Sequence, residues 1–361
     1  MDLKRVLIIT TILLLIIPCL AAQEISLNEF VRVNNFTYQW SPFLDTGELR
    51  RGTDSFRFKV GEDFIVHNFR EKIPGGLSRR SGSLMLDQRT ADAILQKTRH
   101  SSSNVPSSNA ALSRINRNTQ PSGYRVAAIL IDPGHGGRDP GAIGRHTVNG
   151  RPFVIKEKDV TLNIALELDR KLRRTFQDKK IILTRNDDSF INLDDRVEKG
   201  NSVQLGDNEI IIMVSIHANA SVANRNARGF EVWHLPPDFR RDLIDENSVD
   251  YNARDILHIL NKMLEEEFLI ESIRLAQNIL DGLDASIGRI SPSRGLKEKS
   301  WFVVRNAKMP AVLVEVGFVT NKEEAQLLAS RAHLMKITEG IYNGIKKFIN
   351  DIETIDFGGE R

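Results

Sequence analysis

The sequence has very little cysteine, because Cys19 is the single one among 361 residues. One thiol forms no intrachain disulfide and cannot supply a zinc site built from several thiolates. A large excess of charge of one sign is also lacking: the formal net charge is +3, and Lys and Arg form no cluster. This near balance excludes nucleic acid as an expected partner. No internal repeat is evident, so nothing indicates a repeat architecture.

A hydrophobic run long enough to span a membrane is missing as well. The apolar stretch from Val6 to Ile17 is shorter than the ~20 residues of a transmembrane helix. It follows two basic residues and precedes small residues, which is typical of a secretory signal peptide. We therefore expect residues 1–22 to be removed and the protein to be exported, to the periplasm or the cell wall. The alternatives are an uncleaved membrane anchor, or a lipid on Cys19, which Pro18 fits poorly.

Composition divides the remaining chain into four parts. Residues 24–97 contain short alternating stretches, such as "SFRFKV", and predict a small β-rich module. Residues 98–123 are rich in Ser and Asn and predict a flexible linker. Residues 124–350 alternate β-branched runs with amphipathic ones, and residues 351–361 form a tail. The alternation predicts an α/β domain with a twisted, mostly parallel or mixed sheet and helices on both faces.

Within this domain, the apolar pattern predicts individual elements. The expected strands cover residues 125–132, 180–185, 209–216, 229–235, 301–305 and 311–317. The expected helices cover residues 159–172, 253–286, 321–329 and 334–349. The order of these elements makes several strands parallel, so their carboxyl ends are expected at one edge of the sheet, where ligands collect.

Polar side chains gather at these expected strand ends. His135 lies in the glycine-rich turn that follows the first strand, and His217 follows the buried run "IIIMVSI". Glu157 precedes a helix, and Glu315 lies inside the apolar strand "AVLVEVGF". Two histidines and a carboxylate are the ligand set of a catalytic zinc site. Glu315 is then suited to take a proton from the activated water, and the nearby cation compensates its buried charge.

Other interpretations of these residues stay open from the pattern alone. Histidines at strand ends are often simply hydrogen-bonded, and Glu157 also suits a solvated helix start. The glycine-rich turn is an alternative phosphate site, although it has neither a following GK[ST] nor a GxGxxG pattern. No HExxH motif is present. The residues taken by themselves favour an exported zinc hydrolase.

Several stretches together resemble one family, the zinc-dependent N-acetylmuramoyl-L-alanine amidases of the amidase-3 type. The resemblance covers about residues 125–349 and is specific as a set, since the stretches occur in the family's order. They are "IDPGHGGRDPGAIG" (131–144), "EKDVTLNIALEL" (157–168), "LTRNDDSFINLDDRVEKGN" (183–201), "VSIHANA" (214–220) and the long stretch 293–328.

The resemblance implies roles for particular residues. His135, Glu157 and His217 match the ligands of one zinc ion, and Glu315 matches the catalytic glutamate. The implied reaction is hydrolysis of the peptidoglycan amide between N-acetylmuramic acid and L-alanine of the stem peptide, in wall turnover and daughter-cell separation. Three further residues in matched motifs are expected to shape the substrate cleft: Asn219, Arg305 and Asn321.

The sequence departs from the family pattern at two places. An insertion at 145–156 separates His135 from Glu157 by more than usual. Residues 235–263 stand where some members carry a helix over the active site, so we expect a regulatory lid that an activator protein addresses. The module 24–97 occupies the position of wall-targeting domains, which is an argument from position alone.

Two other functions compete with the peptidoglycan amidase. One is a zinc peptidase or amidase that acts on another exported substrate. The other is a catalytically silent wall-binding protein that keeps the fold. The complete set of His135, Glu157, His217 and Glu315 argues against the silent protein, because a silent copy tolerates the loss of one of them.

Overall fold

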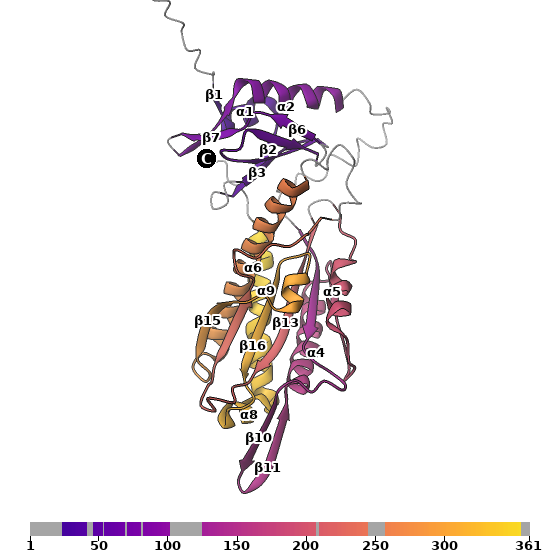
Figure 1. Ribbon diagram of the computed structural model, residues 1–361, viewed down its shortest axis with the longest axis vertical. Helices are drawn as coiled ribbons and strands as arrows, with labels where there is room; N and C mark the ends of the chain where they lie inside the picture. The colour runs from indigo at the N-terminus through magenta and orange to yellow at the C-terminus, as the bar shows by residue number, and fades with distance from the viewer. Residues whose placement is uncertain are drawn as a thin grey trace, which may run out of the picture. The chain divides into compact units, whose positions relative to one another are not determined.

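The computed structural model describes residues 24–41, 46–52, 54–68, 71–80, 82–101, 125–206, 209–244 and 257–354. These residues form two compact units, one built mainly from residues 24–101 and one that contains residues 125–354 (Figure 1). The predicted signal peptide and the tail after Thr354 lie outside the described residues, as does most of the predicted linker. Among the described residues, no helix combines the length and apolar character needed to cross a membrane.

The first unit is β-rich, which confirms the prediction for this part of the chain. One sheet has the order β1-β8-β7, and a second runs β2-β3-β4-β5-β6. Two helices complete the unit, α1 (Leu27–Asn34) and α2 (Gln88–Ser101). The strands are β1 (Glu24–Ser26), β2 (Thr37–Ser41), β3 (Thr46–Arg51), β4 (Asp54–Lys59), β5 (Phe64–His67), β6 (Glu71–Pro74), β7 (Leu77–Arg80) and β8 (Ser83–Asp87).

Local sequence signals explain the first helix of this unit. The Ser26 hydroxyl accepts a hydrogen bond from the Glu29 amide at 3.2 Å, which is a helix N-cap. At the other end, Asn35 adopts a left-handed conformation with φ of 54° and closes the helix. Phe30 of α1 is buried with Phe36 and Phe56, so the helix contributes to the core of this unit.

The second unit is built on a six-stranded mixed sheet with the order β12-β9-β13-β16-β14-β15. The first four strands are parallel to one another, whereas β14 is antiparallel to β16 and parallel to β15. The strands are β9 (Arg125–Pro133), β12 (Lys180–Leu183), β13 (Glu209–Asn219), β14 (Phe230–His234), β15 (Ser293–Glu298) and β16 (Ala311–Phe318). Figure 1 shows β13 and β16 side by side in the middle of this sheet.

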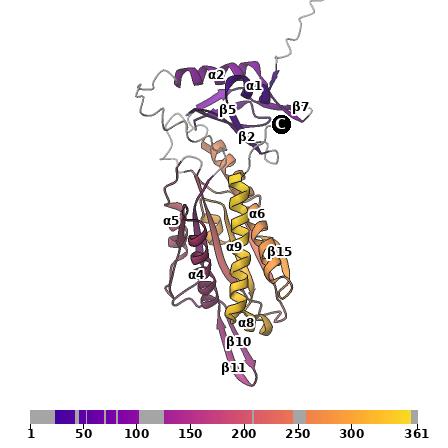
Figure 2. The same ribbon diagram turned by 180° about the vertical axis from the view of Figure 1, so that it is seen from behind.

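Helices cover both faces of the sheet, as the alternation predicts. One face packs against α4 (Glu157–Thr175), α6 (Leu257–Ile287) and α9 (Arg331–Thr354), and Figure 2 shows α9 lying between the other two. The opposite face packs against α5 (Leu193–Asn201) and α7 (Phe302–Asn306), while α8 (Lys322–Leu328) follows β16. Alternate residues of each strand enter the two cores: Val312 and Val314 belong to the core covered by α4, α6 and α9, and Leu313 belongs to the core covered by α5 and α7.

The expectation of a strand at 301–305 is wrong, because this stretch forms the short helix α7. The consecutive residues Val303 and Val304 are both buried, whereas a half-buried strand would turn one of them away. The Arg305 amide donates to the Trp301 carbonyl at 2.8 Å, and the Asn306 side chain donates to the Phe302 carbonyl at 2.9 Å. Packing and these local bonds override the β propensity of the stretch.

The inserted stretch before Glu157 is a two-stranded hairpin, β10 (Ile143–Val148) and β11 (Arg151–Lys156). Its turn residues Asn149 and Gly150 have φ of 51° and 73°. Two left-handed residues make the type of tight turn that matches the twist of paired strands, and Asn-Gly is its preferred sequence.

Candidate metal centre

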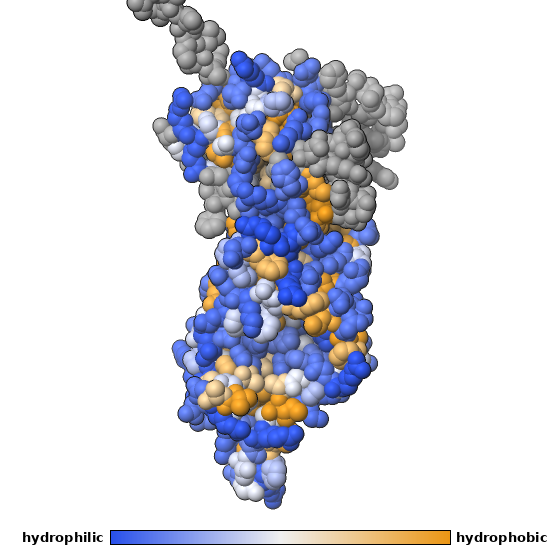
Figure 3. All heavy atoms as spheres, in the orientation of Figure 1, coloured by the Kyte–Doolittle hydropathy of each residue, from blue (hydrophilic) through white to orange (hydrophobic). Residues whose placement is uncertain are grey.

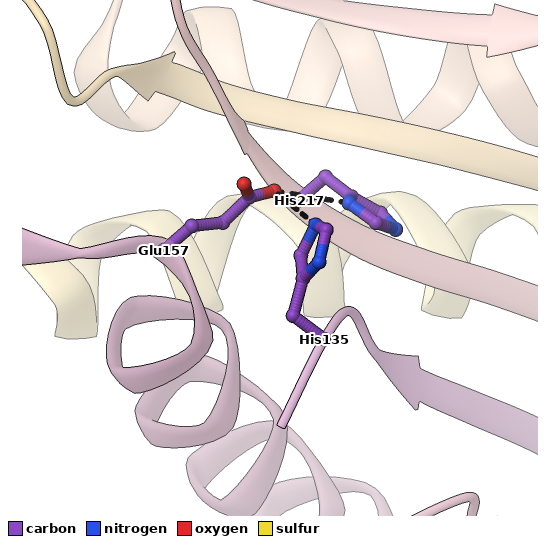
Figure 4. A group of neighbouring side chains, drawn as sticks. All are labelled: His135, Glu157 and His217. Carbon is purple, nitrogen blue, oxygen red and sulfur yellow. Dashed lines mark hydrogen bonds and ion pairs between the residues drawn. The ribbon is translucent and has the colours of Figure 1, made fainter. Parts of the chain in front are cut away.

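Three polar residues converge beyond the carboxyl ends of β9 and β13. His135 lies in the turn after β9, His217 near the end of β13, and Glu157 opens α4 (Figure 4). One oxygen of Glu157, Oε1, lies 3.2 Å from His135 Nε2 and 3.0 Å from His217 Nδ1. One ligand atom from each residue therefore falls within 4.8 Å of the other two.

The Glu157 carboxylate is held from both sides by backbone amides. Its Oε2 accepts from the Ala142 amide at 2.8 Å, and its Oε1 accepts from the Ala218 amide at 3.0 Å. Burial opposes ionisation of Glu157, but the hydrogen bonds and charges of His135 and His217 outweigh it, so the pKa of its carboxyl is far below its usual range. Glu157 is therefore ionised, and the two amides fix the position of its carboxylate.

His135 has a strained backbone, with φ of 60° in a residue that is not glycine. Such a conformation costs of order 1–3 kcal/mol and persists only where the surroundings enforce it. The Arg196 guanidinium of α5 donates to the His135 carbonyl at 2.6 Å, and His135 Nδ1 lies 2.8 Å from a carboxylate oxygen of Asp139. The contact with Asp139 orients the ring so that Nε2 points toward Glu157.

Two glycines form the close walls of this cluster. A Cβ atom on Gly134 would lie 2.4 Å from the His217 ring. On Gly141, where φ is +62°, it would lie 2.6 Å from Glu157 Oε2 and 2.7 Å from the His135 ring. Glycine is required at both positions because any side chain would push the three ligand atoms apart.

Glu315 lies beside this cluster on the neighbouring strand. Parallel pairing of β13 and β16 sets Glu315 opposite His217, and antiparallel pairing of β14 sets Glu231 opposite Glu315. Neighbouring strands are ~4.8 Å apart, so these side chains share one face at close range. Glu315 is 8% exposed, and no described residue donates a hydrogen bond to its Oε2.

The surroundings of Glu315 oppose its ionisation. Burial, followed by the negative charges of Glu157 and Glu231, raises the pKa of the Glu315 carboxyl well above its usual range, and Lys299 only partly offsets this. A buried carboxylate without a donor is costly unless a cation compensates it. A cation beside Glu315 would therefore favour the ionised form of this carboxyl group.

The donor set fits a divalent metal ion. Two imidazole nitrogens and a carboxylate oxygen suit zinc, and ligand atoms of a tetrahedral site with ~2.1 Å bonds lie roughly 3.4 Å apart. The two separations from Glu157 Oε1, 3.2 Å and 3.0 Å, are close to this spacing. Three ligands leave further positions for water or substrate, which is the pattern of a catalytic rather than a structural site.

The three predicted cleft residues lie in different surroundings. Asn219 ends β13, and its amide donates to Glu231 at 2.7 Å. Asn321 caps α8, where its side-chain oxygen accepts from the Glu323 and Glu324 amides. Arg305 is exposed on α7 with its guanidinium 5.2 Å from the centre of the Phe302 ring. Among the described residues, no side-chain contact joins Arg305 to His135 or His217.

Sequence reasoning missed two carboxylates of this site. Asp139 contacts His135, and its position four residues later in the glycine-rich turn was a usable signal. Glu231 is buried beside Glu315 and is paired with Arg294 at 2.8 Å. A carboxylate within the apolar stretch "GFEVWHL" was the corresponding signal for Glu231.

The predicted lid is described only at its two ends. Residues 245–256, with Asp245 and Glu246, lie outside the described residues. Before them, Arg241 forms a buried ion pair with Glu265 of α6 at 2.9 Å and donates to the Ala307 carbonyl at 2.7 Å. The start of the predicted lid is therefore fixed to α6 and to the segment after α7.

Comparison with known proteins assigns this geometry to a family. The profile of the N-acetylmuramoyl-L-alanine amidases matches residues 129–347, more than half of the 361 residues and including all four site residues. The chain belongs to this amidase family. The family is generally zinc-dependent, in agreement with the His135–Glu157–His217 cluster.

The chain is similar to a named amidase and to an uncharacterized protein. The chain is 30% identical over 239 residues to the N-acetylmuramoyl-L-alanine amidase AmiC of Neisseria meningitidis, covering 63% of this chain and 53% of AmiC. It is 32% identical over 220 residues to the uncharacterized protein YqiI of Bacillus subtilis, covering 61% of this chain and 84% of YqiI. The chain thus spans most of YqiI but about half of AmiC.

A solved structure is similar as well. The amidase from Clostridium difficile 630 is 28% identical, with a TM-score of 0.47, and the alignment covers 63% of this chain and 98% of that one.

Proposed function

We propose that this protein is a zinc-dependent hydrolase of peptidoglycan that cleaves the amide bond between N-acetylmuramic acid and L-alanine of the stem peptide. The observation that carries the proposal is the cluster of His135, Glu157 and His217 with Glu315 beside it, in a chain that belongs to the amidase family. A silent wall-binding protein would not need a complete ligand set next to a carboxylate whose Oε2 receives no hydrogen bond from the described residues.

The three ligand residues hold one zinc ion in this proposal. Zinc, when bound, polarises the scissile carbonyl and makes water nucleophilic near neutral pH. The chain supplies the orientation: Asp139 fixes the His135 ring, and the amides of Ala142 and Ala218 fix Glu157. These contacts keep the three ligand atoms together without the metal, which lowers the cost of binding it.

Glu315 handles the proton in the proposed reaction. Its carboxylate takes a proton from the attacking water and returns it to the leaving amine of L-alanine. Both duties need a pKa near the working pH, and burial beside Glu157 and Glu231 raises the pKa of Glu315 in that direction. Strand β16, which is buried along its whole length, keeps the side chain rigidly beside the cluster.

Digestion of purified sacculi tests the proposal. The full chain, loaded with zinc, should release stem peptides with a free N-terminal L-alanine, and a chelator should stop the release until zinc is added back. Release of fragments cut within the stem would favour a peptidase instead. Binding without any release would favour the silent wall-binding protein.

Regulation by a lid over residues 235–263 is a further part of the proposal, and an activator protein would act there. Its support is the position of this stretch and its attachment to α6 through Arg241 and Glu265. The sacculus assay with residues 238–252 deleted tests it. Faster basal release supports an inhibitory lid, and unchanged release rejects it.

Export to the periplasm or the wall, and wall targeting by residues 24–97, complete the proposal. Export is supported by the signal-peptide pattern of residues 1–22, since the substrate lies outside the cytoplasmic membrane. N-terminal sequencing of protein recovered from the envelope should begin just after residue 21 or 22. An intact N-terminus in the cytosolic fraction would contradict export.

A further inference from the structure

A pocket of about 880 Å³ lies next to the hairpin formed by β10 and β11. Three separate segments line it: strand β10 with Arg145, the loop after β13 with Arg225 and Arg228, and the start of α8 with Lys322 and Glu323. The volume is in the range of pockets that take small ligands rather than single ions. In Figure 3 the hairpin, at the lower end of the view, is mainly hydrophilic.

The pocket carries an excess of positive charge. Arg228 is largely occupied, since it pairs with Glu323 at 3.3 Å and donates to the Ile290 carbonyl at 2.7 Å. Arg145, Arg225 and Lys322 differ, because no acceptor in the described parts of the chain contacts their charged groups. Three exposed cations that line one pocket, with no counter-charge contacting them in the described parts of the chain, create a positive potential that attracts an anionic ligand.

The pocket is connected to the metal cluster through the hairpin. At the root of the hairpin, the Ala142 amide donates to Glu157. Further out, His146 Nε2 lies 2.8 Å from the Val319 carbonyl, which ties β10 to the end of β16. The lining thus starts where β13 and β16 end, at the same edge of the sheet as His217.

We propose that this pocket binds carboxylate groups of the stem peptide. It would select peptidoglycan whose stem peptides carry free, un-amidated carboxylates. The inference rests on the proposed amidase function and names its preferred substrate class. Guanidinium groups bind carboxylates through two parallel hydrogen bonds. Because the cations come from three segments, they suit charges spread along an extended peptide better than one compact phosphate.

The test compares two soluble substrates, N-acetylmuramoyl peptides with free carboxylates and the same peptides with those carboxylates amidated. The zinc-loaded full chain should show a higher kcat/KM for the acidic substrate, by about tenfold, and high salt should reduce this preference. Arg145→Gln, Arg225→Gln and Lys322→Gln should each lower the preference by about two- to threefold, as expected for partly exposed ion pairs. In the triple variant, the ratio of kcat/KM for the acidic substrate to kcat/KM for the amidated substrate should be close to one.

Arg174→Gln is the matched control, since it removes the same charge from an exposed position in the last turn of α4. At 1.5 Å per residue, this position is roughly 25 Å along the helix from Glu157. It should leave the preference unchanged. A wild-type chain that cleaves both substrates equally, or a triple variant that keeps the preference, overturns the inference and leaves the amidase function intact.

Binding of the free acidic and amidated stem peptides, measured by calorimetry on the same proteins, separates this inference from the proposed function. If neither substrate is cleaved, the amidase function fails, and the calorimetry alone decides on the pocket. Tighter binding of the acidic peptide that the triple variant loses supports the pocket. Equal binding of both peptides refutes it, and tight binding of inorganic phosphate with none of the acidic peptide redirects the site to a phosphate-bearing ligand.

Discussion

Strand β13 has two parallel neighbours, and each carries one buried carboxylate on the same face of the sheet. Asp132 on β9 lies opposite Ser215, and Glu315 on β16 lies opposite His217. The two carboxylates are therefore close in the fold and similar in burial, at 0% and 8% exposed. Their surroundings are opposite in character. Comparing them therefore separates the effect of burial on the pKa of a carboxyl group from the effect of hydrogen bonding on it.

Asp132 is fully provided with donors. Arg196 and Thr184 donate to its Oδ1 at 2.8 Å and 2.6 Å, and Ser215 donates to its Oδ2 at 2.7 Å. Burial opposes its ionisation, but the charge of Arg196 and these hydrogen bonds outweigh it and lower the pKa of the Asp132 carboxyl. Arg196 also holds the carbonyls around His135, so Asp132 stabilises the loop that carries this ligand.

Glu315 has no comparable partners among the residues that the structure describes, and the pKa of its carboxyl is raised instead. Buried polar groups in native proteins are nearly always hydrogen-bonded, so an exception asks for an explanation. The difference supports the proposal that Asp132 serves the fold and Glu315 serves the chemistry. The comparison predicts that exchanging each acid for its amide affects stability at Asp132 and turnover at Glu315.

The largest expected effect is on turnover, for Glu315→Gln. The amide cannot accept and return the proton, so release of stem peptides from sacculi should fall by about 10²–10⁴-fold. Zinc content, measured by atomic absorption, should stay at one ion per chain, because Glu315 is not among the three proposed ligands. The melting temperature should not fall, since the amide has the shape of the carboxyl group and no described residue donates a hydrogen bond to Oε2 that the substitution would lose.

His217→Ala is the matched comparison, because it alters a ligand on the adjacent strand. It should lose zinc and turnover together, whereas Glu315→Gln should lose turnover alone. Normal release by Glu315→Gln would remove this residue from the mechanism and leave the raised pKa without a function.

The next effect is on stability, for Asp132→Asn. It leaves the buried Arg196 guanidinium without its counter-charge, and breaking a buried pair in this way costs about 3–5 kcal/mol. Unfolding in denaturant, followed on the full chain, should show this loss. The strained turn at His135 should also loosen, so zinc affinity should fall with stability.

Ser215→Ala should cause a smaller loss of stability at the same site, because it removes one donor and keeps the charge of Asp132. Losing one neutral donor should cost about 1 kcal/mol, which also keeps the prediction testable if Asp132→Asn fails to fold. Equal stability of Asp132→Asn and the wild type would show that the donors around Asp132 are not needed for the fold.

Much of this site could be predicted from the sequence, because strand ends are readable from periodicity. The runs before His135 and His217 are apolar, the second one strongly β-branched, and parallel strands bring their carboxyl ends to one edge. The hairpin at 143–156 also had a local signal, the Asn149-Gly150 pair, although it was interpreted only as an insertion.

Other features depend on contacts between distant segments, which spacing along the chain does not encode. The register that sets Glu231 opposite Glu315 arises only from the antiparallel pairing of β14 with β16. The helix at Phe302–Asn306 was predicted as a strand because its β-branched residues favour one locally. Packing of Val303 and Val304 against the sheet decides otherwise.

The smallest expected effect on turnover concerns Glu271 on α6, a half-buried carboxylate outside the metal cluster. Arg274 contacts its Oε1 at 3.2 Å, whereas no described residue donates to its Oε2. Burial raises the pKa of Glu271 from 4.5 to about 7, and Arg274 only partly offsets this. Glu271 thus tests whether a carboxylate oxygen without a hydrogen-bond donor is by itself a sign of a catalytic group. We predict that it does not, and that Glu271→Gln changes stability but not turnover.

The sign of the stability change follows from proton binding. Between pH 4.5 and about 7 the folded state holds the Glu271 proton more tightly than the unfolded state, so stability falls as the pH rises through this window. Each pKa unit corresponds to about 1.4 kcal/mol, so Glu271→Gln should be more stable than the wild type above pH 7, by about 3 kcal/mol at most. At pH 4.5 and below, the two should unfold at similar temperatures.

Thermal melts of both proteins from pH 4.5 to 9 measure this difference, and Glu198→Gln, at an exposed position on α5, serves as the control that should show none. Parallel curves for Glu271→Gln and the wild type would contradict the raised pKa. A loss of peptide release in Glu271→Gln would break the comparison itself, since an acid far from the histidines would then act in the chemistry. If release is unchanged, a carboxylate oxygen without a hydrogen-bond donor is not enough to make a residue catalytic. The proposed role of Glu315 then depends on its position beside the three proposed metal ligands as well.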